Sequence, residues 1–249
     1  MLIGLKDKVA IVTGGGNGIG RGITERLVDE GAKVVIVGRT ENTLVETASQ
    51  SNDISYKLAD ISKTEDVTRL LKDVVDQYGR LDVLVNNAGM APVTPFSKLD
   101  MVEFDAVFAT NVRGLVDLSL QALPMLKQSK GSIINISTSI VGKPMANMSV
   151  YAASKAAVNS FTRVWAKELA GDGVRVNSVG VGPIWTSIYE KTQLSEEEAQ
   201  AHVERVKQIV PMGRFGTVEE VASIVAFLAS TEASFVTGAD YAVDGGFAA

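Results

Sequence analysis

The 249-residue sequence contains no cysteine, only six prolines and a single histidine. Without cysteine there are no disulfides and no thiolate metal sites, which is compatible with a reducing compartment. No apolar stretch approaches the ~20 residues that span a bilayer. The opening residues 1–8 carry Lys6, Asp7 and Lys8 where a secretory signal would need an apolar run. We therefore expect a soluble cytoplasmic protein with no membrane contact and no metal.

The chain also lacks an excess of positive charge, since its net charge is −5 and its pI is about 5.1. This balance excludes the basic footprint of a nucleic-acid-binding protein. Hydrophobic residues make up 46% of the chain, which supports a substantial core. We find no linker, low-complexity tract or repeat, so we expect a single domain over residues 1–249.

Short apolar, mostly β-branched runs alternate with helical patterns along the chain. Strands are expected at residues 9–13, 33–39, 54–58, 81–85, 132–136, 174–179 and 241–243. Helices are expected from the glycine-rich stretch to residue 31 and at 41–49, 64–78, 104–127 (interrupted near 111–114), 150–169, 187–210 and 217–229. The alternation predicts an α/β fold with about seven parallel strands and helices on both faces. The polar helical stretch at about 187–212 is interpreted as a substrate lid.

A glycine-rich segment, Gly14-Gly15-Gly16-Asn17-Gly18-Ile19-Gly20, lies between the first strand and its helix. Strand, glycine turn and helix together form the context of a dinucleotide-binding fingerprint. Glycines let the backbone approach a pyrophosphate, and the helix N-terminus offers free amides to it. The sequence therefore predicts a Rossmann-type doubly wound sheet, with a ligand-free glycine turn as the alternative.

The end of the second strand reads Gly38-Arg39, where an acid would accept a hydrogen bond from a ribose 2′-hydroxyl. A guanidinium suits a 2′-phosphate instead. We expect NADP(H) to be preferred, with NAD(H) possible, and a solvated Arg39 is the alternative. Two later strand ends are expected to line the same crevice, and they carry Asp60, Ile61, Asn87, Ala88 and Gly89.

Tyr151 and Lys155 lie four residues apart on an expected helix, so one helical turn brings an ammonium near a phenol. A neighbouring positive charge lowers a phenol pKa, which would suit proton exchange with an alcohol. The pair alone is weak evidence for a catalytic site, because a tyrosine and a lysine at this spacing also occur by chance. Asn111 within an apolar helix and the hydroxyls of Ser137, Thr138 and Ser139 add polar groups that a site could use.

In this order and spacing, the chain resembles the short-chain dehydrogenase/reductases over essentially its whole length. The resemblance is carried by these motifs: Thr13-Gly14-x-x-x-Gly18-x-Gly20, Asn86-Asn87-Ala88-Gly89, Asn111, the serine cluster before Tyr151-x-x-x-Lys155, and Gly182-Pro183.

The resemblance implies that Tyr151 is the acid/base, Lys155 lowers its pKa and holds the nicotinamide ribose, and Asn111 holds a linking water. Gly182, Ile184 and Thr186 would lie at the carboxamide end. The implied cofactor contacts are Gly14, Asn17, Gly18, Ile19, Gly20, Arg39, Asp60, Ile61, Asn87, Ala88, Gly89, Tyr151, Lys155, Gly182, Ile184 and Thr186.

The hydroxyl that orients the substrate is expected to be Ser139, with Thr138 as the alternative. The family's usual serine stands thirteen residues before the tyrosine, which is Thr138 here, but its Ser-x-x-Gly pattern fits Ser139 to Gly142.

The function expected from the resemblance is NADP(H)-dependent interconversion of a small-molecule ketone and a secondary alcohol by hydride transfer. The alternatives are a 3-oxoacyl-[acyl-carrier-protein] reductase and a non-catalytic nucleotide-sensing protein of the same fold. The resemblance also suggests a homotetramer.

Overall fold

The computed structural model describes residues 2–186 and 196–249, and its centre is a seven-stranded sheet. The strand order is β3-β2-β1-β4-β5-β6-β7, and every described strand pair is parallel. The strands are β1 (Val9–Thr13), β2 (Lys33–Gly38), β3 (Ile54–Leu58), β4 (Val83–Asn86), β5 (Ser132–Thr138), β6 (Arg175–Val181) and β7 (Asp240–Val243). The predicted doubly wound parallel sheet is confirmed.

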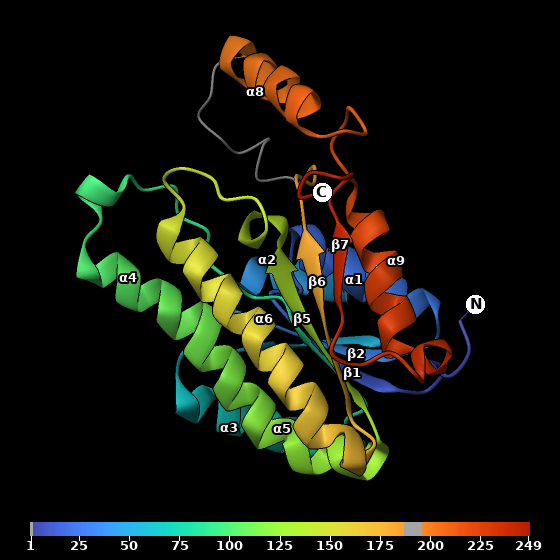
Figure 1. Cartoon of the computed structure of the whole chain (residues 1–249). Helices are drawn as coiled ribbons and strands as arrows, with labels where there is room; N and C mark the ends of the chain where they lie inside the picture. Colours follow the sequence, from blue (N-terminus) through green and yellow to red (C-terminus); the bar gives the residue numbers. More distant parts are fainter. Residues whose placement is uncertain (1, 187–195) are drawn as a thin grey trace.

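Helices cover both faces of this sheet (Figure 1). The helices are α1 (Gly18–Asp29), α2 (Glu41–Ala48), α3 (Thr64–Tyr78), α4 (Met101–Phe108), α5 (Leu115–Ser129), α6 (Ser149–Leu169), α8 (Glu196–Ile209) and α9 (Val218–Ala229). Side chains of α1, α2 and α9 pack in one core cluster, and those of α3, α5 and α6 pack in the other. No helix of the described residues has the length and apolar character needed to cross a bilayer.

The two-residue alternation of strands explains why both faces are apolar. In β1, Ala10 and Val12 face the cluster of α1 and α9, whereas Val9 and Ile11 face the cluster of α3 and α5. All residues of β1 are buried, as expected for a parallel strand covered on both sides.

The long helix expected at 104–127 is divided into α4, a π-helical segment at Ala109–Gly114, and α5. The interruption lies where the sequence predicted it. The helix begins three residues earlier than expected, because the Asp100 carboxylate accepts a hydrogen bond from the Glu103 amide at 2.7 Å and caps it. Gly114 allows close packing, since a Cβ there would lie 2.6 Å from the Ile61 carbonyl oxygen.

β2, β6 and β7 differ from the expected bounds by one or two residues at an end, and β4 and β5 differ in ways that matter for the site. β4 begins at Val83 rather than at residue 81, and β5 extends to Thr138 rather than ending at residue 136. In β5, Ser137 and Thr138 pair in register with Gly180 and Val181 of β6. Of the three neighbouring hydroxyl residues Ser137, Thr138 and Ser139, the first two therefore belong to the strand itself.

The helix expected in the lid is present as α8, although residues 187–195 of the predicted lid lie outside the described residues. Val206 and Val210 pack with Ile140 and Phe247 in a small apolar cluster, and Tyr151 packs against that cluster. Figure 1 shows α8 beyond the carboxyl ends of the strands. The described part of the predicted lid thus lies next to the predicted catalytic tyrosine.

Candidate active site

The carboxyl ends of parallel strands meet at one edge of the sheet, and the predicted site residues follow those ends. The glycine-rich turn follows β1, Arg39 follows β2, and Asn87 to Gly89 follow β4. Thr138 ends β5, next to the end of β6.

The glycine-rich turn fits a ligand that approaches the backbone closely. Gly14 has a φ of +67°, and a Cβ on Gly20 would lie 2.1 Å from the Gly14 carbonyl oxygen, so neither position accepts a side chain. The next helix, α1, begins at Gly18, and its N-cap residue Asn17 makes no side-chain capping bond. The first amides of α1 are therefore available to a pyrophosphate, and the turn fits a dinucleotide.

Asn87 joins the glycine-rich turn to the end of β4. Its side-chain amide donates to the carbonyl oxygens of Thr13 and Gly14 at 2.9 and 3.3 Å. The Thr13 hydroxyl accepts from the amides of Asn87 and Ala88, each at 3.0 Å. These bonds fix the glycine-rich turn to the end of β4. Asn87 therefore supports the cofactor site by holding the backbone of the turn in place.

A cavity of about 220 Å³ lies between the glycine-rich turn and the ends of β2, β3 and β4. It gathers seven residues that the sequence placed in the cofactor site: Gly14, Asn17, Arg39, Asp60, Ile61, Ala88 and Gly89. Gly89 adjoins the catalytic centre, since a Cβ there would lie 3.2 Å from Asn111 Oδ1 and 3.5 Å from Lys155 Nζ. The cavity therefore leads from Arg39 toward Lys155.

Arg39 is exposed at the wall of this cavity and makes no hydrogen bond or ion pair with any residue that the structure describes. Thr40 and Thr43 line the same wall. Across the cavity, Asp60 Oδ1 accepts from the amide and the hydroxyl of Ser62 at 3.0 and 2.8 Å. The free guanidinium thus lies where the sequence placed it, at the end of the second strand.

Lys155 is almost completely buried and donates from Nζ to the Ile136 carbonyl oxygen at 2.6 Å. Burial lowers the pKa of its ammonium to about 8, because the apolar surroundings disfavour the charge. The ammonium is still protonated at neutral pH, but its proton is more weakly held than in water.

The pKa of Tyr151 is not shifted in the expected direction, which was a lowering by Lys155. In the structure the pKa of Tyr151 is raised, because burial outweighs the other effects, and a hydrogen bond with the Thr138 hydroxyl lowers it in part. Lys155 acts on the Ile136 carbonyl instead. The phenol is therefore protonated at neutral pH.

The hydroxyl that accompanies Tyr151 in the structure is that of Thr138. Besides its bond with Tyr151, Thr138 lies 3.3 Å from the Val181 carbonyl oxygen, to which it donates. The Ser139 hydroxyl donates instead to the Gly180 carbonyl oxygen at 3.3 Å. The contact with Tyr151 supports the alternative, Thr138, and the choice between Thr138 and Ser139 stays a prediction.

Asn111 lies in the π-helical segment and is fully engaged by hydrogen bonds. Its Oδ1 accepts from the Met90 amide at 2.8 Å, and its Nδ2 donates to the Met90 carbonyl and to Ser154 Oγ at 2.9 and 3.0 Å. π-Helical turns often occur at functional sites. The side chain therefore fixes the loop after β4 against α6.

Ser154 is a residue that the sequence reasoning missed. It is completely buried, accepts from Asn111, and donates to the Tyr151 carbonyl oxygen at 2.7 Å. Its position directly before Lys155, one turn after Tyr151, was the available signal: on a helix that carries a site, a small hydroxyl can bond back to the preceding turn.

The three residues expected at the carboxamide end lie apart from the cavity described above. Gly182 packs on the Asp244 backbone, since a Cβ on Gly182 would lie 2.6 Å from the Asp244 Cα. Ile184 is buried in the core and pairs with Gly216 in a β-bridge. Thr186 lies opposite the glycine-rich turn, 3.7 Å from a Cβ built on Gly18. Thr186 is therefore the residue of the three that faces the turn.

Apolar side chains pack against Tyr151. Ile140, Met148 and Phe247 belong to the same cluster as Tyr151 and the α8 residue Val206. No group of three or more metal-ligating side chains is found in the described part of the chain. The surroundings of the phenol thus suit an apolar group.

Comparison with known proteins places this arrangement among enzymes. A family profile described as "Enoyl-(Acyl carrier protein) reductase" matches residues 14–248. A 3-oxoacyl-[acyl-carrier-protein] reductase from Thermotoga maritima is 37% identical over 97% of this chain and 98% of its own. An L-fucose dehydrogenase from Bos taurus is 38% identical over 96% of this chain and 88% of its own.

A solved structure gives the same result. The 3-ketoacyl-(acyl-carrier-protein) reductase from Brucella melitensis, complexed with NADH, superposes with a TM-score of 0.91 at 31% identity over 99% of this chain and 100% of its own. Together with the glycine-rich turn, Asn111, Tyr151 and Lys155 at one sheet edge, these matches establish that the chain belongs to the short-chain dehydrogenase/reductase family of nicotinamide-dependent oxidoreductases.

Proposed function

We propose that this protein is an NADP(H)-preferring oxidoreductase that interconverts a ketone and a secondary alcohol. The observation that carries the proposal is the continuity of the cofactor cavity with the catalytic centre. Gly89 lines the cavity and also lies beside Asn111 and Lys155, one helical turn from Tyr151.

Tyr151 is the residue proposed to exchange a proton with the substrate oxygen. Its raised pKa keeps the phenol protonated, so in the reductive direction its hydroxyl donates to the carbonyl oxygen. Thr138 is bonded to the same hydroxyl and is proposed to donate to the developing alkoxide as well. When bound, the nicotinamide supplies the hydride that the carbonyl carbon receives.

Lys155 is proposed to hold the cofactor ribose and to stabilise the phenolate that remains after proton donation. An ammonium buried beside a phenolate gains strongly from their attraction, because the local dielectric constant is low. Asn111, Ser154 and Met90 keep the helix and loop around this pair in place.

The preference for NADP(H) rests on Arg39 and on Gly38, which leaves no carboxylate at that strand end. Arg39 is exposed at the cavity wall without a partner among the described residues, so it is free to pair with a 2′-phosphate. The Brucella melitensis relative is described with NADH, which makes NAD(H) the alternative that the experiment must test.

The substrate is proposed to be a medium-sized ketone or secondary alcohol with an apolar body. The cluster of Ile140, Met148, Val206 and Phe247 beside Tyr151 supports this choice. The second candidate is a 3-oxoacyl-[acyl-carrier-protein] reductase, which the names of the Thermotoga maritima and Brucella melitensis relatives favour.

The proposal extends to the assembly and the location of the protein. Exposed Leu120 on α5 and Val164 on α6 support a homotetramer with buried helix faces. A cytoplasmic location is proposed as well, since a chain without cysteine suits a reducing compartment.

The cofactor proposal is tested by fluorescence titration of the protein with NADPH and with NADH. We expect tighter binding of NADPH, and in Arg39→Ala a loss of ~10-fold or more for NADPH with little change for NADH, since the lost contact is a charge-assisted hydrogen bond. Lys98→Ala, which removes a positive charge outside this cavity, serves as the control. Equal affinities for the two cofactors in the unaltered protein would contradict the NADP(H) preference.

A ketone panel with the preferred cofactor then separates the candidate functions. Turnover of apolar ketones supports the main proposal, and turnover restricted to 3-oxoacyl thioesters supports the second candidate. Cofactor binding without turnover of any ketone or thioester would indicate the non-catalytic, nucleotide-sensing alternative.

A further inference from the structure

A second cavity, of about 500 Å³, lies at the opposite edge of the sheet from the catalytic centre. Its wall includes the first residues of three strands, Val83 of β4, Ser132 of β5 and Arg175 of β6. Because β5 and β6 each run seven residues from this edge to the active site, the two sites are separated by about 20 Å. The volume lies within the usual range of ligand sites.

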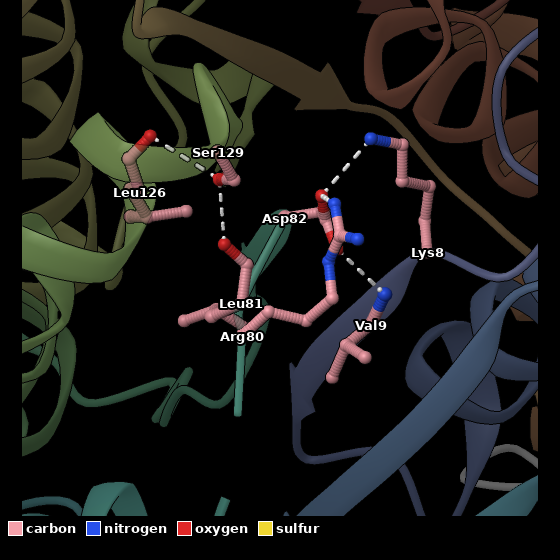
Figure 2. A network of polar contacts seen from close by, with 7 residues as sticks. All are labelled: Lys8, Val9, Arg80, Leu81, Asp82, Leu126 and Ser129. Carbon is pink, nitrogen blue, oxygen red and sulfur yellow. Dashed lines mark hydrogen bonds and ion pairs between the residues drawn. The ribbon is translucent and has the colours of Figure 1, made fainter. Parts of the chain in front are cut away.

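Positive charge predominates in this cavity, although the chain as a whole is acidic. Lys8, Lys130 and Arg175 line it together with one carboxylate, that of Asp82. Figure 2 shows Asp82 between Arg80 and Lys8, with ion-pair distances of 2.6 and 3.0 Å, while the Val9 amide donates to it at 3.0 Å. The carboxylate is thus already neutralised by groups of its own surroundings.

Arg175 is the cation with the least compensation. It is partly buried, and its guanidinium donates to the carbonyl oxygens of Ser230 and Val236 at 3.1 and 3.5 Å. No carboxylate of the described residues lies within ion-pair distance of it, and the nearby Asp172 is paired with Lys127 at 2.8 Å. Burial accordingly lowers the pKa of Arg175. A guanidinium has five N–H donors, so most of them are left for a ligand.

Lys130 adds a second cation without a partner among the described residues. It ends α5 in the left-handed conformation, with a φ of +51°, and its side chain lies against Gly173. The cavity mouth also carries the fully exposed ring of Phe235. An apolar surface therefore borders a cationic one.

From this arrangement we propose that the cavity is a second ligand site, which binds a small organic anion that joins a carboxylate or a phosphate to a ring-sized apolar body. Arg175 and Lys130 pair with the anionic group, and Phe235 packs on the apolar body. The site is separate from the cofactor cavity and does not depend on the proposed function.

The site is tested by isothermal titration calorimetry with benzoate, phenyl phosphate and inorganic phosphate as probes. Saturating nicotinamide cofactor is present, so that the glycine-rich turn cannot bind the probe. The variants are Arg175→Gln, Lys130→Asn and Phe235→Ala, with Lys167→Asn as a charge-matched control at an exposed position outside the cavity. Asparagine tolerates the left-handed conformation at residue 130, so Lys130→Asn removes the charge without backbone strain.

We expect binding of benzoate or phenyl phosphate, weakened ~10-fold or more by Arg175→Gln and several-fold by Lys130→Asn, and unchanged in Lys167→Asn. Phe235→Ala should weaken the aromatic probes about 2- to 10-fold and leave inorganic phosphate unchanged. Whichever of benzoate and phenyl phosphate binds with the lower dissociation constant identifies the preferred anionic group as carboxylate or phosphate.

Absence of binding for all three probes at millimolar concentration would overturn the proposal. Binding that neither Arg175→Gln nor Lys130→Asn weakens would also overturn it. If Arg175→Gln unfolds, as thermal denaturation would show, Lys130→Asn alone decides between these outcomes.

Discussion

At the scale of single residues, the site combines the buried ammonium of Lys155 with the partly buried phenol of Tyr151, one helical turn away. Lys155 and Tyr151 have pKa values shifted in opposite directions, downward for the ammonium and upward for the phenol, and burial is the main cause of both shifts. Each shift moves the group toward its neutral form. At neutral pH the phenol of Tyr151 is therefore protonated, and the Lys155 ammonium lies closer to its titration than an exposed lysine does.

Thr138 and Ser139 form a matched pair of neighbouring hydroxyls for a direct test. We expect Thr138→Ala to lower kcat by at least ~10-fold, since it removes the hydrogen bond at the Tyr151 hydroxyl. Ser139→Ala loses only the bond to the Gly180 carbonyl and should stay within ~3-fold of the unaltered protein. Steady-state kinetics on one ketone measures both, and the reverse ranking would restore Ser139 as the substrate-orienting residue.

The lowered pKa of Lys155 predicts a pH dependence of stability. Its folded pKa of about 8 lies below the ordinary lysine value of 10.5, so between these pH values the folded chain holds fewer protons than the unfolded chain. The unfolding free energy then rises with pH across this window, whereas below pH 8 the cost of the buried charge is present in full, at about 3 kcal/mol.

Urea unfolding of the unaltered protein and of Lys155→Met at pH 7 to 10 measures this effect. The unaltered protein should gain stability relative to the variant as the pH rises from 8 toward 10. A difference between the two proteins that does not change with pH would show that the ammonium is not desolvated in the folded state.

At the scale of elements, the π-helical segment and α6 act as one unit through Asn111 and Ser154. The Ser154 hydroxyl bonds both Asn111 and the Tyr151 carbonyl, so it connects the segment to the first turn of the catalytic helix. The sequence predicted the interruption near Asn111 from a polar side chain in an apolar helix. It did not show the Ser154 contact, because that contact depends on how the two helices pack.

We expect Ser154→Ala to lower kcat several-fold and stability by about 1–3 kcal/mol, because the buried Asn111 amide loses an acceptor. Ser160→Ala, at an exposed position of the same helix, is the matched control and should change neither. Kinetics and urea unfolding of both variants measure the effect. If the two variants behave alike, Ser154 has no part in positioning Tyr151.

Some elements were accessible from the sequence because their signals are local. The helix expected at 217–229 begins at a capping box formed by Thr217 and Glu220, in which the Thr217 hydroxyl accepts from the Glu220 amide and the Glu220 carboxylate accepts from the Thr217 amide. The end of β5 was not accessible, because pairing with β6 extends it to Thr138. That extension places Thr138, whose hydroxyl acts on the pKa of Tyr151, within the strand.

At the scale of the whole molecule, the sheet brings distant segments to two opposite edges. The edge of the carboxyl ends joins the glycine-rich turn, the cofactor cavity and Tyr151, and its main members could be named from motifs. The other edge places Lys8, Lys130 and Arg175 around one cavity. No sequence motif predicts that second site, since its residues are far apart in the sequence and come together only in the folded chain.

The central claim is that Tyr151 protonates the substrate oxygen beside a bound nicotinamide cofactor. The most direct test compares NADPH oxidation with a ketone substrate by the unaltered protein and by Tyr151→Phe, with NADPH affinity measured in parallel. The account predicts that kcat falls by ~10²-fold or more while the NADPH dissociation constant stays within ~3-fold, because the variant removes only the hydroxyl. Near-full kcat in Tyr151→Phe would contradict the claim.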